Sequence, residues 1–462
     1  MFAEGQEDTI AAIATPPGEG GVGIVRISGP RAREIGDAVF RPAGGGEPLS
    51  RRPHGTVTYG RAVEADGREI DTVLALVMRA PRSYTGEDVV ELQGHGGRVV
   101  LRRLLRRVIE AGARPAEPGE FTRRAFLNGK LDLVQAEAVC DLVRARSDRA
   151  AEAALEQLEG RLSRSFNRLY DLLLETAADL ETTLDFAEEE LPDDVFSGLK
   201  GRLDEALGLL RDLLATWDEG RLLREGARAV ILGRPNAGKS TLLNALLGFD
   251  RAIVSAVPGT TRDTIEEDFV LDGIPLRIVD TAGLRRTACE IEAEGIRRAE
   301  DHGRKADLAL YVVDASEPPA AEDRERLAGL DAARTLVVLN KTDLGRRTTA
   351  DDFPGFRCVE LQALSGEGLD RLKAAMAELL EQGPGWGAEP HAAISERHRL
   401  LLVEAEKEAL SARKLVAADA EANAAQAVEH LRTALEAVGR TVGRVYHEEL
   451  LESIFSRFCI GK

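Results

Sequence analysis

The chain has 462 residues, which is enough for two to four domains that each bury a core of their own. Its 79 acidic residues outnumber 61 basic ones, and the net charge of −18 argues against a broad basic face that would bind nucleic acid strongly by itself. If RNA is the substrate, we therefore expect another subunit to hold much of it. The four cysteines lack metal-ligand spacing, and the sequence has no leader or apolar run of transmembrane length, so we expect a soluble, cytoplasmic protein without a membrane partner.

Residues 1 to about 128 are predicted to form a mixed α/β domain. Residues 99–110 have helical periodicity and an arginine-rich face. The glycine cluster around His95 is typical of a small-ligand loop, but His95 fits a structural turn equally well. The expected strands are 10–14, 22–27, 72–77 and 88–92.

From about 129 to 221 the apolar residues follow the period of a helix. A stripe that begins at Leu155 and ends at Leu184 advances in steps of three and four, which predicts a core-facing helix. Helical patterning resumes in residues 385–462. Two helical blocks that flank one compact domain most simply pack together into a single bundle.

Residues 233–240 read GRPNAGKS and lie between an apolar run and a helix-like segment, which is the context of a phosphate-binding loop. The glycines let backbone N–H groups approach phosphate oxygens, and the following helix adds the positive end of its dipole. Lys239 is then expected to reach the β- and γ-phosphates, and the Ser240 hydroxyl to ligate Mg²⁺.

Three further motifs follow this loop. Asp280 ends an apolar run and begins Asp-Thr-Ala-Gly, where an acid can hold Mg²⁺ through water and Gly283 can donate to a γ-phosphate. Asn340 begins Asn-Lys-Thr-Asp, whose Asp343 can accept from both the ring N–H and the exocyclic amine of guanine. A hydroxyl in 260–261 can complete the Mg²⁺ shell. Four motifs in this order resemble the guanine-nucleotide-binding G domain, and they indicate GTP rather than ATP.

One position departs from the signalling GTPases, which carry a glutamine after this Asp-x-x-Gly to orient the attacking water. This chain has Leu284 there, and leucine cannot hydrogen-bond to water. Hydrolysis therefore needs another polar group, or it is very slow.

The order of parts resembles the MnmE family of tRNA-modification GTPases over essentially the whole chain. The segments that carry the resemblance are 14–17, 20–23, 91–97, 118–121, 125–132, 223–226 and 458–462. The implied fold is α/β and α multidomain. A mixed α/β folate-binding domain occupies 1–128, a helical bundle is built from 129–221 and 385–462, and a Ras-like G domain is inserted at 222–384.

The resemblance implies a function shared with a partner, the flavoprotein MnmG. Together they add a carboxymethylaminomethyl group to C5 of the wobble uridine of certain tRNAs. The N-terminal domain is implied to dimerise and to bind 5-formyltetrahydrofolate or another tetrahydrofolate derivative. By motif match its site is lined by Arg26, Glu91, Lys130 and Lys462, whose charges suit the pterin and the anionic groups of such a ligand. Cys459 is implied to lie near the pterin, where a catalytic and a packing role both stay open.

The resemblance also implies a homodimer in which two G domains meet and K⁺ takes the place of an arginine finger. Glu292 would orient the attacking water and act with Lys239 as a catalytic residue. Without the resemblance, a solvated carboxylate at the start of a helix is the favoured interpretation of Glu292. The implied Mg²⁺ ligands are Ser240 and Thr261, and the implied K⁺ ligands are Asn236, Ser255, Val257 and Thr260. The whole implied nucleotide site comprises Asn236, Ala237, Gly238, Lys239, Ser240, Thr241, Ser255, Ala256, Val257, Pro258, Gly259, Thr260, Thr261, Asp280, Thr281, Ala282, Gly283, Asn340, Lys341, Thr342, Asp343, Gln362, Ala363 and Leu364.

Two questions stay open at this point. The guanine-backing loop of the family usually begins Ser-Ala, but Gln362 precedes Ala363 here, so the source of the support that serine gives is unknown. The function also has rivals. A ribosome-associated or assembly-type GTPase switch is the first, and the folate-like N-terminal domain argues against it. A stand-alone folate-dependent transferase is the second, and it conflicts with four intact nucleotide motifs.

Overall fold

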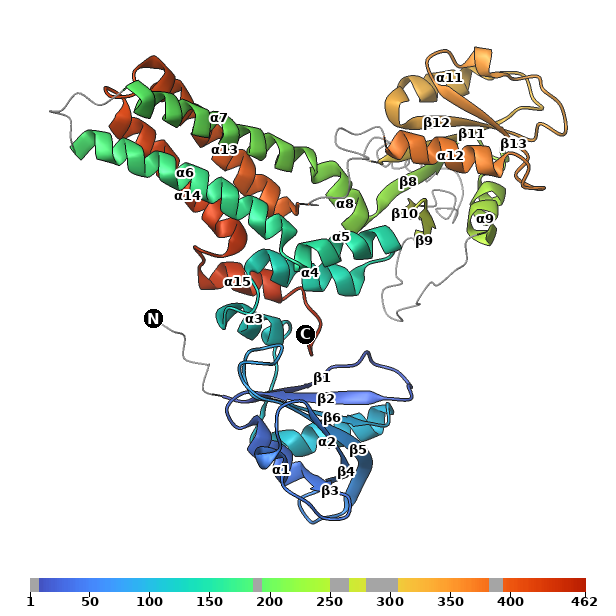
Figure 1. Ribbon diagram of the computed structural model, residues 1–462. Helices are drawn as coiled ribbons and strands as arrows, with labels where there is room; N and C mark the ends of the chain where they lie inside the picture. Colours follow the sequence, from blue (N-terminus) through green and yellow to red (C-terminus); the bar gives the residue numbers. More distant parts are fainter. Residues whose placement is uncertain (1–7, 186–192, 250–265, 280–305, 382–393) are drawn as a thin grey trace. The chain divides into compact units, whose positions relative to one another are not determined.

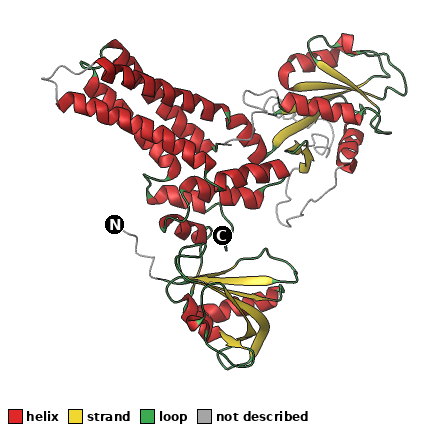
Figure 2. Cartoon of the chain, in the orientation of Figure 1, coloured by secondary structure: helices red, strands yellow, loops and turns green. Residues whose placement is uncertain are grey.

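The computed structural model describes residues 8–185, 193–249, 266–279, 306–381 and 394–462 (Figure 1). The chain divides into two compact units. The first combines Met1–Cys140, Leu158–Tyr170 and Leu435–Lys462, and the second combines Asp141–Gln157 with Asp171–Ala434. Figure 2 shows that each unit mixes helices with strands. Among the described residues, no helix is both long and apolar enough to cross a membrane.

The first unit is built around a seven-stranded sheet in the order β3-β4-β5-β6-β2-β1-β7. Neighbouring strands are antiparallel, except that β7 runs parallel to β1. The strands are β1 (Ile10–Ile13), β2 (Gly23–Ser28), β3 (Phe40–Pro42), β4 (Thr56–Val63), β5 (Glu69–Met78), β6 (Val89–Gly94) and β7 (Arg114–Pro115). The four predicted strands are thus confirmed as β1, β2, β5 and β6.

Two helices, α1 (Ala32–Val39) and α2 (Arg98–Glu110), contribute to one apolar core with this sheet. A smaller cluster joins Ile10 and Ala12 of β1 to Phe121 of helix α3 (Glu120–Leu127). Because successive residues of a strand point to opposite faces, alternate residues of β1 serve the two clusters. The predicted helix at 99–110 is confirmed as α2.

Helices on both sides of the nucleotide-loop segment pack together, as the bundle prediction requires. Helix α7 packs against α13, and Arg413 pairs with Asp204 at 2.8 Å while Arg211 pairs with Glu406 at 3.2 Å. The helices of the two blocks are α4 (Leu133–Arg144), α5 (Asp148–Leu158), α6 (Arg161–Asp185), α7 (Asp193–Ala215), α8 (Trp217–Glu225), α13 (Glu396–Ala418), α14 (Ala424–Val442) and α15 (Glu448–Phe455).

The prediction of one helix under the apolar stripe that begins at Leu155 is wrong. The stripe spans α5 and α6, which are separated by Gly160 at φ +81°, a left-handed conformation that ends a helix. The side chain of Gln135 donates to the Leu158 carbonyl at 2.9 Å and satisfies the end of α5. The two ends of the stripe are also exposed, Leu155 by 47% and Leu184 by 41%, so only its middle faces a core.

The second unit contains a six-stranded sheet in the order β13-β12-β11-β8-β10-β9, parallel except for β9. Its strands are β8 (Ala227–Leu232), β9 (Glu266–Leu271), β10 (Ile274–Val279), β11 (Leu308–Asp314), β12 (Thr335–Asn340) and β13 (Arg357–Leu361). Helices α9 (Lys239–Phe249), α11 (Ala321–Ala328) and α12 (Leu369–Leu380) connect or follow strands. Since β10 and β11 lie on opposite sides of β8, the strand order reverses there, and such a reversal leaves a crevice at the carboxyl edge of a parallel sheet.

Candidate functional site

The turn between β8 and α9 has a backbone that requires glycine at two positions. Gly233 has φ +133°, and a Cβ there would lie 2.2 Å from the carbonyl oxygen of Val312. Gly238 has φ +102°, and a Cβ there would lie 2.2 Å from Nδ2 of Asn340. The Lys239 ammonium donates to the carbonyls of Gly233 (2.8 Å) and Arg234 (2.7 Å), which closes the turn. The predicted phosphate loop therefore has the closed geometry that its motif indicates.

Arg234 ties this loop to α11, a contact that the sequence motif did not reveal. Its guanidinium pairs with Asp323 at 3.0 Å and with Glu317 at 3.2 Å. Asp323 is fully buried and also accepts from the Tyr311 hydroxyl at 2.9 Å. Burial and the nearby Asp323 carboxylate raise the pKa of Tyr311, which stays a neutral donor. One side of the phosphate loop is thus held by an ion pair whose carboxylate is buried and whose guanidinium is partly exposed.

Asn340 holds the other side. Its buried amide donates to the Ala237 carbonyl at 2.9 Å and accepts from the Ala363 N–H at 3.0 Å. One side chain therefore connects the phosphate loop with the loop after β13. The predicted residues Asn236, Ala237, Asn340 and Ala363 are brought together at the carboxyl edge of the sheet.

The residues after Asn340 continue along this edge. Lys341 has φ +63°, and its ammonium pairs with Asp314 at 2.6 Å. Burial raises the pKa of Asp314, but hydrogen bonds from Lys341 and Ser316 outweigh it and hold that pKa below its ordinary value. Asp343 is exposed. Ser240 and Thr241 lie in the first turn of α9, and Leu364 is 92% exposed in the loop after β13.

Part of the predicted site lies outside the described residues. These positions are Ser255, Ala256, Val257, Pro258, Gly259, Thr260, Thr261, Asp280, Thr281, Ala282, Gly283, Leu284 and Glu292. The described half of the site is therefore the phosphate loop together with the two loops after β12 and β13.

In the first unit, Arg26 of β2 and Glu91 of β6 stand opposite each other and form an ion pair of 2.8 Å. The Arg26 guanidinium lies 5.6 Å from the ring centre of Phe121 and 5.9 Å from that of Tyr84. Gln93 donates to the second Glu91 oxygen at 3.3 Å. The sequence analysis assigned neither Tyr84 nor Phe121 to this site, since an aromatic residue carries no signal of such a contact by itself.

The C-terminal tail completes this group. Arg26 also donates to the Gly461 carbonyl at 3.4 Å. Gly461 has φ +99°, and a Cβ there would lie 2.5 Å from the Ile13 carbonyl, so the tail lies directly against β1. Cys459 is exposed with a free thiol, and its carbonyl accepts from the Lys462 N–H at 3.3 Å. We call Arg26, Glu91, Tyr84, Phe121 and the 459–462 tail the Arg26 cluster. Lys130, by contrast, is exposed and donates to the Pro81 carbonyl at 3.2 Å.

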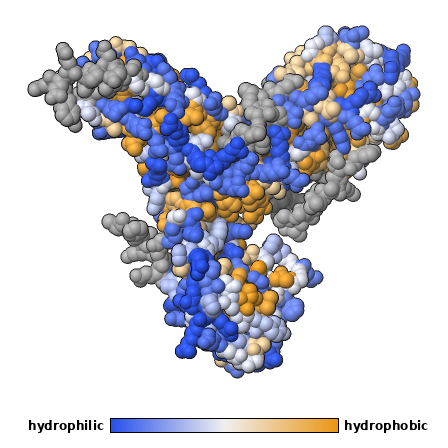
Figure 3. All heavy atoms as spheres, in the orientation of Figure 1, coloured by the Kyte–Doolittle hydropathy of each residue, from blue (hydrophilic) through white to orange (hydrophobic). Residues whose placement is uncertain are grey.

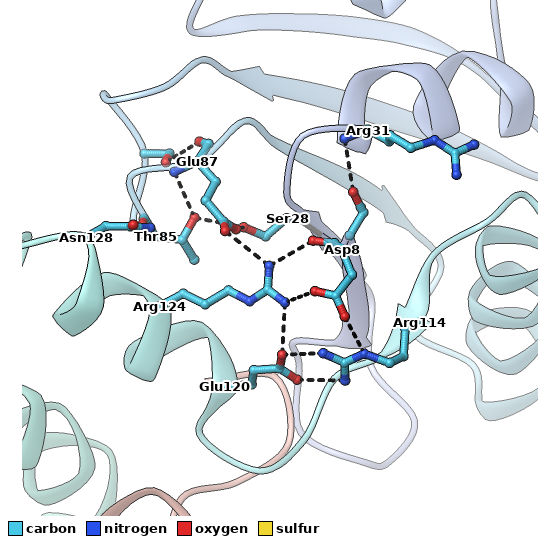
Figure 4. Close-up of polar contacts among 11 residues, drawn as sticks. Asp8, Ser28, Arg31, Thr85, Glu87, Arg114, Glu120, Arg124 and Asn128 are labelled. Atoms are coloured by element: carbon cyan, nitrogen blue, oxygen red, sulfur yellow. Dashed lines mark hydrogen bonds and ion pairs between the residues drawn. The ribbon is translucent and has the colours of Figure 1, made fainter. Parts of the chain in front are cut away.

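A buried ion network supports the Arg26 cluster from the side of α3 (Figure 4). Arg124, only 4% exposed, donates to Asp8 at 2.6 Å, to Glu120 at 3.0 Å and to Glu87 at 3.1 Å. Glu87 in turn accepts from the fully buried Ser28 hydroxyl of β2 at 2.6 Å. The network holds α3, which carries Phe121. The Tyr84 hydroxyl is hydrogen-bonded to that of Thr122 in the same helix at 2.8 Å, so both rings are held through α3.

Two carboxylates of this network, those of Glu120 and Asp8, stay ionised near neutral pH. Burial raises the pKa of Glu120, but hydrogen bonds from Arg114, the Glu117 N–H and Arg124 outweigh burial and bring the pKa below its ordinary value. The same balance lowers the pKa of Asp8.

A phosphate loop and an Asn-Lys-Thr-Asp loop, joined at the carboxyl edge of one parallel sheet, define a guanine-nucleotide-binding P-loop GTPase. Residues 9–130 match the family model described as GTP-binding protein TrmE N-terminus, and residues 133–459 match the MnmE helical domain. The chain belongs to the MnmE family of tRNA modification GTPases, enzymes that hydrolyse GTP in tRNA modification.

Curated relatives match over their full length. The tRNA modification GTPase MnmE of Geobacter metallireducens is 45% identical over 462 residues, which is 99% of each chain. That of Symbiobacterium thermophilum is 46% identical over 467 residues, 99% of this chain and 100% of the relative. Among solved structures, the G domain of the T. maritima FeoB iron transporter is 25% identical with a TM-score of 0.26, and covers 33% of this chain and 98% of that one.

The buried network predicts a specific pH dependence of stability. Because the pKa of Glu120 in the folded chain lies below its ordinary value of 4.5, its stabilisation is complete above pH 4.5 and is lost as the pH falls through the folded pKa. Glu120→Gln should therefore lower the free energy of unfolding by about 1–3 kcal/mol near neutral pH. The difference from wild type should shrink in acid.

Melting temperatures measured between neutral pH and pH 3.5 check this prediction. Glu34→Gln is the matched control, since Glu34 is 72% exposed and its ion pair among the described residues is a long one, 3.7 Å to Arg31. A constant difference between wild type and Glu120→Gln at every pH would show that Glu120 is not held ionised by its arginines.

Proposed function

We propose that this chain is the GTP-hydrolysing subunit of a complex that, with a MnmG flavoprotein, adds a carboxymethylaminomethyl group to C5 of the wobble uridine of certain tRNAs. A tetrahydrofolate derivative supplies the one-carbon unit. This chain of a tRNA modification GTPase family carries two sites, the phosphate loop with the loops after β12 and β13, and the Arg26 cluster. Their presence in one chain is the observation that supports the proposal. The division into 1–128, 129–221, 222–384 and 385–462 is part of this proposal.

In the nucleotide site, Lys239 binds the β- and γ-phosphates, and Ser240 with Thr261 ligates Mg²⁺. The position of Ser240 in the first turn of α9 supports this role, because its hydroxyl is a hard oxygen donor beside the phosphate loop. Asp343 accepts from the ring N–H and the exocyclic amine of guanine, and the Ala363 N–H faces guanine O6. In this structure the Ala363 N–H donates to Asn340 at 3.0 Å, so the proposed bond to guanine O6 would replace or share that contact. The same contact holds the guanine loop beside the phosphate loop.

Asp343→Asn should replace GTP preference by a preference for xanthosine triphosphate, because the amide offers a donor where the guanine amine also donates. Sites that read such polar pairs discriminate by about 10⁴–10⁵. Competition binding of GTP and xanthosine triphosphate to the full-length variant checks this outcome. Unchanged GTP affinity would remove Asp343 from the nucleotide site.

The Arg26 cluster is the proposed tetrahydrofolate site. Glu91 can pair with the amine and ring N–H of a pterin, and the aromatic rings of Tyr84 and Phe121 offer an apolar surface beside Arg26. Lys130 and Lys462 are proposed to meet the anionic end of the ligand. Bound folate supplies the one-carbon unit, while these side chains bind and orient it. Cys459 is exposed on the tail and could act as a thiol nucleophile there.

Purified protein should bind 5-formyltetrahydrofolate, and Arg26→Ala or Glu91→Ala should weaken that binding while GTP hydrolysis stays unchanged. Calorimetry measures the affinity. Arg33→Ala is a matched control, because Arg33 forms a comparable ion pair with Asp88, at 2.6 Å, outside the cluster. Equal folate affinity in wild type and in both cluster variants would contradict the assignment.

A homodimer is part of the proposal, and the sheet of the first unit supports it. Val57 and Tyr59 of β4 and Leu74 of β5 are between 42% and 61% exposed. Strand register places Tyr59 opposite Leu74 and Leu74 opposite Gln93, so these apolar residues share the sheet face of Glu91. Figure 3 shows apolar surface on this unit. Such a face suits contact with a second copy.

Hydrolysis in the proposed mechanism needs K⁺, because Leu284 cannot orient water. Asn236, Ser255, Val257 and Thr260 ligate the ion, which offsets charge that develops between the phosphates, and Glu292 orients the water. Asn236 is exposed on the phosphate loop at φ +63°, which supports a role toward a ligand. Two G domains must meet for this arrangement.

Hydrolysis should therefore be fast in K⁺ and slow in Na⁺, by about 10³–10⁵ if K⁺ matches the effect of an arginine finger. Asn236→Ala should remove the K⁺ response, and Glu292→Ala should lower kcat while GTP binding persists. Steady-state GTPase assays in matched chloride salts check both variants. Equal rates in Na⁺, or normal turnover of Glu292→Ala, would refute the mechanism.

The tRNA is proposed to be held largely by the partner, since this chain carries a net charge of −18. The complex would work in the cytoplasm, where mature tRNA is found. The alternative, a ribosome-associated or assembly-type GTPase, leaves the Arg26 cluster without a function. Analysis of wobble uridines in a deletion strain separates the two functions, because only the first predicts loss of the modified base.

A further inference from the structure

Helix α2 carries the arginine-rich face that the sequence predicts, and neither of the two proposed sites uses it. The helix packs on the first sheet through Leu101, Leu104 and Val108, which are buried in the apolar core. Residues four positions apart share one face of a helix, so the exposed Arg98, Arg102 and Arg106 form a row along the solvent side of α2. We call these residues the α2 row.

The charge of the α2 row is only partly compensated. In the parts of the chain that the structure describes, Arg98 and Arg102 form no ion pair and no side-chain hydrogen bond. Arg106 is 60% exposed, and its distances to Glu64 (3.5 Å) and Glu110 (3.6 Å) exceed those of normal hydrogen bonds. Glu64 is instead hydrogen-bonded to Arg103, outside the row, at 2.8 Å. Like charges four residues apart repel each other, so the row favours an anionic partner.

The start of α2 adds to the positive field of the row. The first turn of the helix contains no acidic residue, and no side chain caps it. The positive end of the helix dipole therefore lies beside Arg98 without a carboxylate in that turn. The nearby carboxylate of Asp71 is bound by His95, whose N–H and Nδ1 each lie 2.7 Å from one of its oxygens.

The α2 row belongs to the least acidic part of the chain. Residues 1–128 contain 18 basic and 17 acidic side chains, whereas the remaining residues contain 43 basic and 62 acidic ones. The net charge of −18 is thus carried by the rest of the chain. Salt screens exposed charges beyond about 8 Å, so distant carboxylates do not cancel the local field of the row.

The α2 row and the Arg26 cluster lie on opposite faces of the first sheet. Val25 and Ile27 of β2 point into the core that contains Leu101 of α2. Arg26 stands between them in the strand, so its side chain points to the other face. A partner bound along α2 therefore leaves the Arg26 cluster and the exposed apolar residues of β4 and β5 uncovered.

We propose that the α2 row binds the phosphate backbone of tRNA. RNA is the anion of choice because the chain belongs to a family of GTPases that act in tRNA modification. The planar guanidinium of arginine matches the oxygens of a phosphate group. Residues four positions apart are separated by about 6 Å along the helix axis, so neighbouring arginines of the row can bind neighbouring phosphates of one strand.

This contact goes beyond the proposed function, in which the partner holds most of the tRNA. Contacts to phosphate position a nucleic acid without reading its sequence. The α2 row therefore orients tRNA on this chain, while affinity from a row of this size stays small enough to agree with an acidic protein.

The test measures binding of a fluorescently labelled tRNA with a wobble uridine to the full-length chain, at salt concentrations between about 50 and 200 mM. The double variant Arg98→Gln, Arg102→Gln should lose about tenfold in affinity at the lowest salt. Its plot of log K against log salt should also be shallower than that of wild type, by about 1–2 in slope. Arg98→Lys with Arg102→Lys keeps both charges and should bind nearly as wild type does.

Arg41→Gln with Arg51→Gln is the matched control, because it removes two charges at exposed positions of the same unit outside α2. Its salt slope should equal that of wild type. Equal losses in the two glutamine variants would reduce the effect to general charge and overturn the proposal. Melting temperatures confirm that each variant is folded.

Two further outcomes would overturn the proposal. One is the absence of measurable tRNA binding to wild type at the lowest salt. The other is unchanged tRNA binding in Arg98→Gln, Arg102→Gln, and if that variant also loses contact with a second copy or with the flavoprotein, the row serves an acidic protein surface. GTP hydrolysis without tRNA and folate affinity should stay at wild-type values in every variant, so failure of this inference is distinct from failure of the proposed function.

Discussion

The buried side-chain amide of Asn340 sets the geometry of the loops that form the predicted nucleotide site. It donates to Ala237 in the phosphate loop and accepts from Ala363 in the loop after β13. Both bonds lie within a buried site, where an unpaired amide would cost about 1–3 kcal/mol for each lost partner. The three loops are therefore coupled, and a change in any one of them is felt by the other two. A side chain at position 238 would collide with the same amide, so only glycine fits there.

The Arg26 cluster follows a different rule, since its parts come from both ends of the sequence. Arg26 and Glu91 are aligned by strand pairing. Phe121 belongs to α3, which the network around Arg124 holds, and Tyr84 is hydrogen-bonded to Thr122 of the same helix. Three carboxylates surround the nearly buried Arg124 guanidinium, and Arg114 supplies a second cation to Asp8 and Glu120. Pairing with these two arginines stabilises the carboxylates in a partly buried network. Strand pairing sets Arg26 opposite Glu91, and the ion network holds α3 against this part of the chain.

The predictions from sequence were best where the signal is local. The phosphate loop and the Asn-Lys-Thr-Asp loop each occupy a few consecutive residues between a strand and a turn or helix, and both were found without a structure. Arg26 and Glu91 were reached only through family resemblance, because no spacing links positions on two strands in advance. The ion pair of Arg234 with Asp323 joins residues 89 positions apart, and no sequence pattern predicts it.

The break at Gly160 was missed for a related reason. A step of four from Leu158 to Leu162 continues the helical period across the turn, so periodicity alone could not show it.

The contact between Arg26 and Gly461 joins residues 435 positions apart, and this separation has a consequence for biosynthesis. The first sheet emerges early from the ribosome and holds all its strands within the first 115 residues, so it can form as a unit during translation. The surface around Arg26 nevertheless stays open until residue 461 has emerged. A chain that stops short, by a nonsense codon or by proteolysis, would keep an ordered N-terminal domain but would lack the segment that closes its polar cluster. The surface around Arg26 is therefore complete only after the intervening domains have been synthesised.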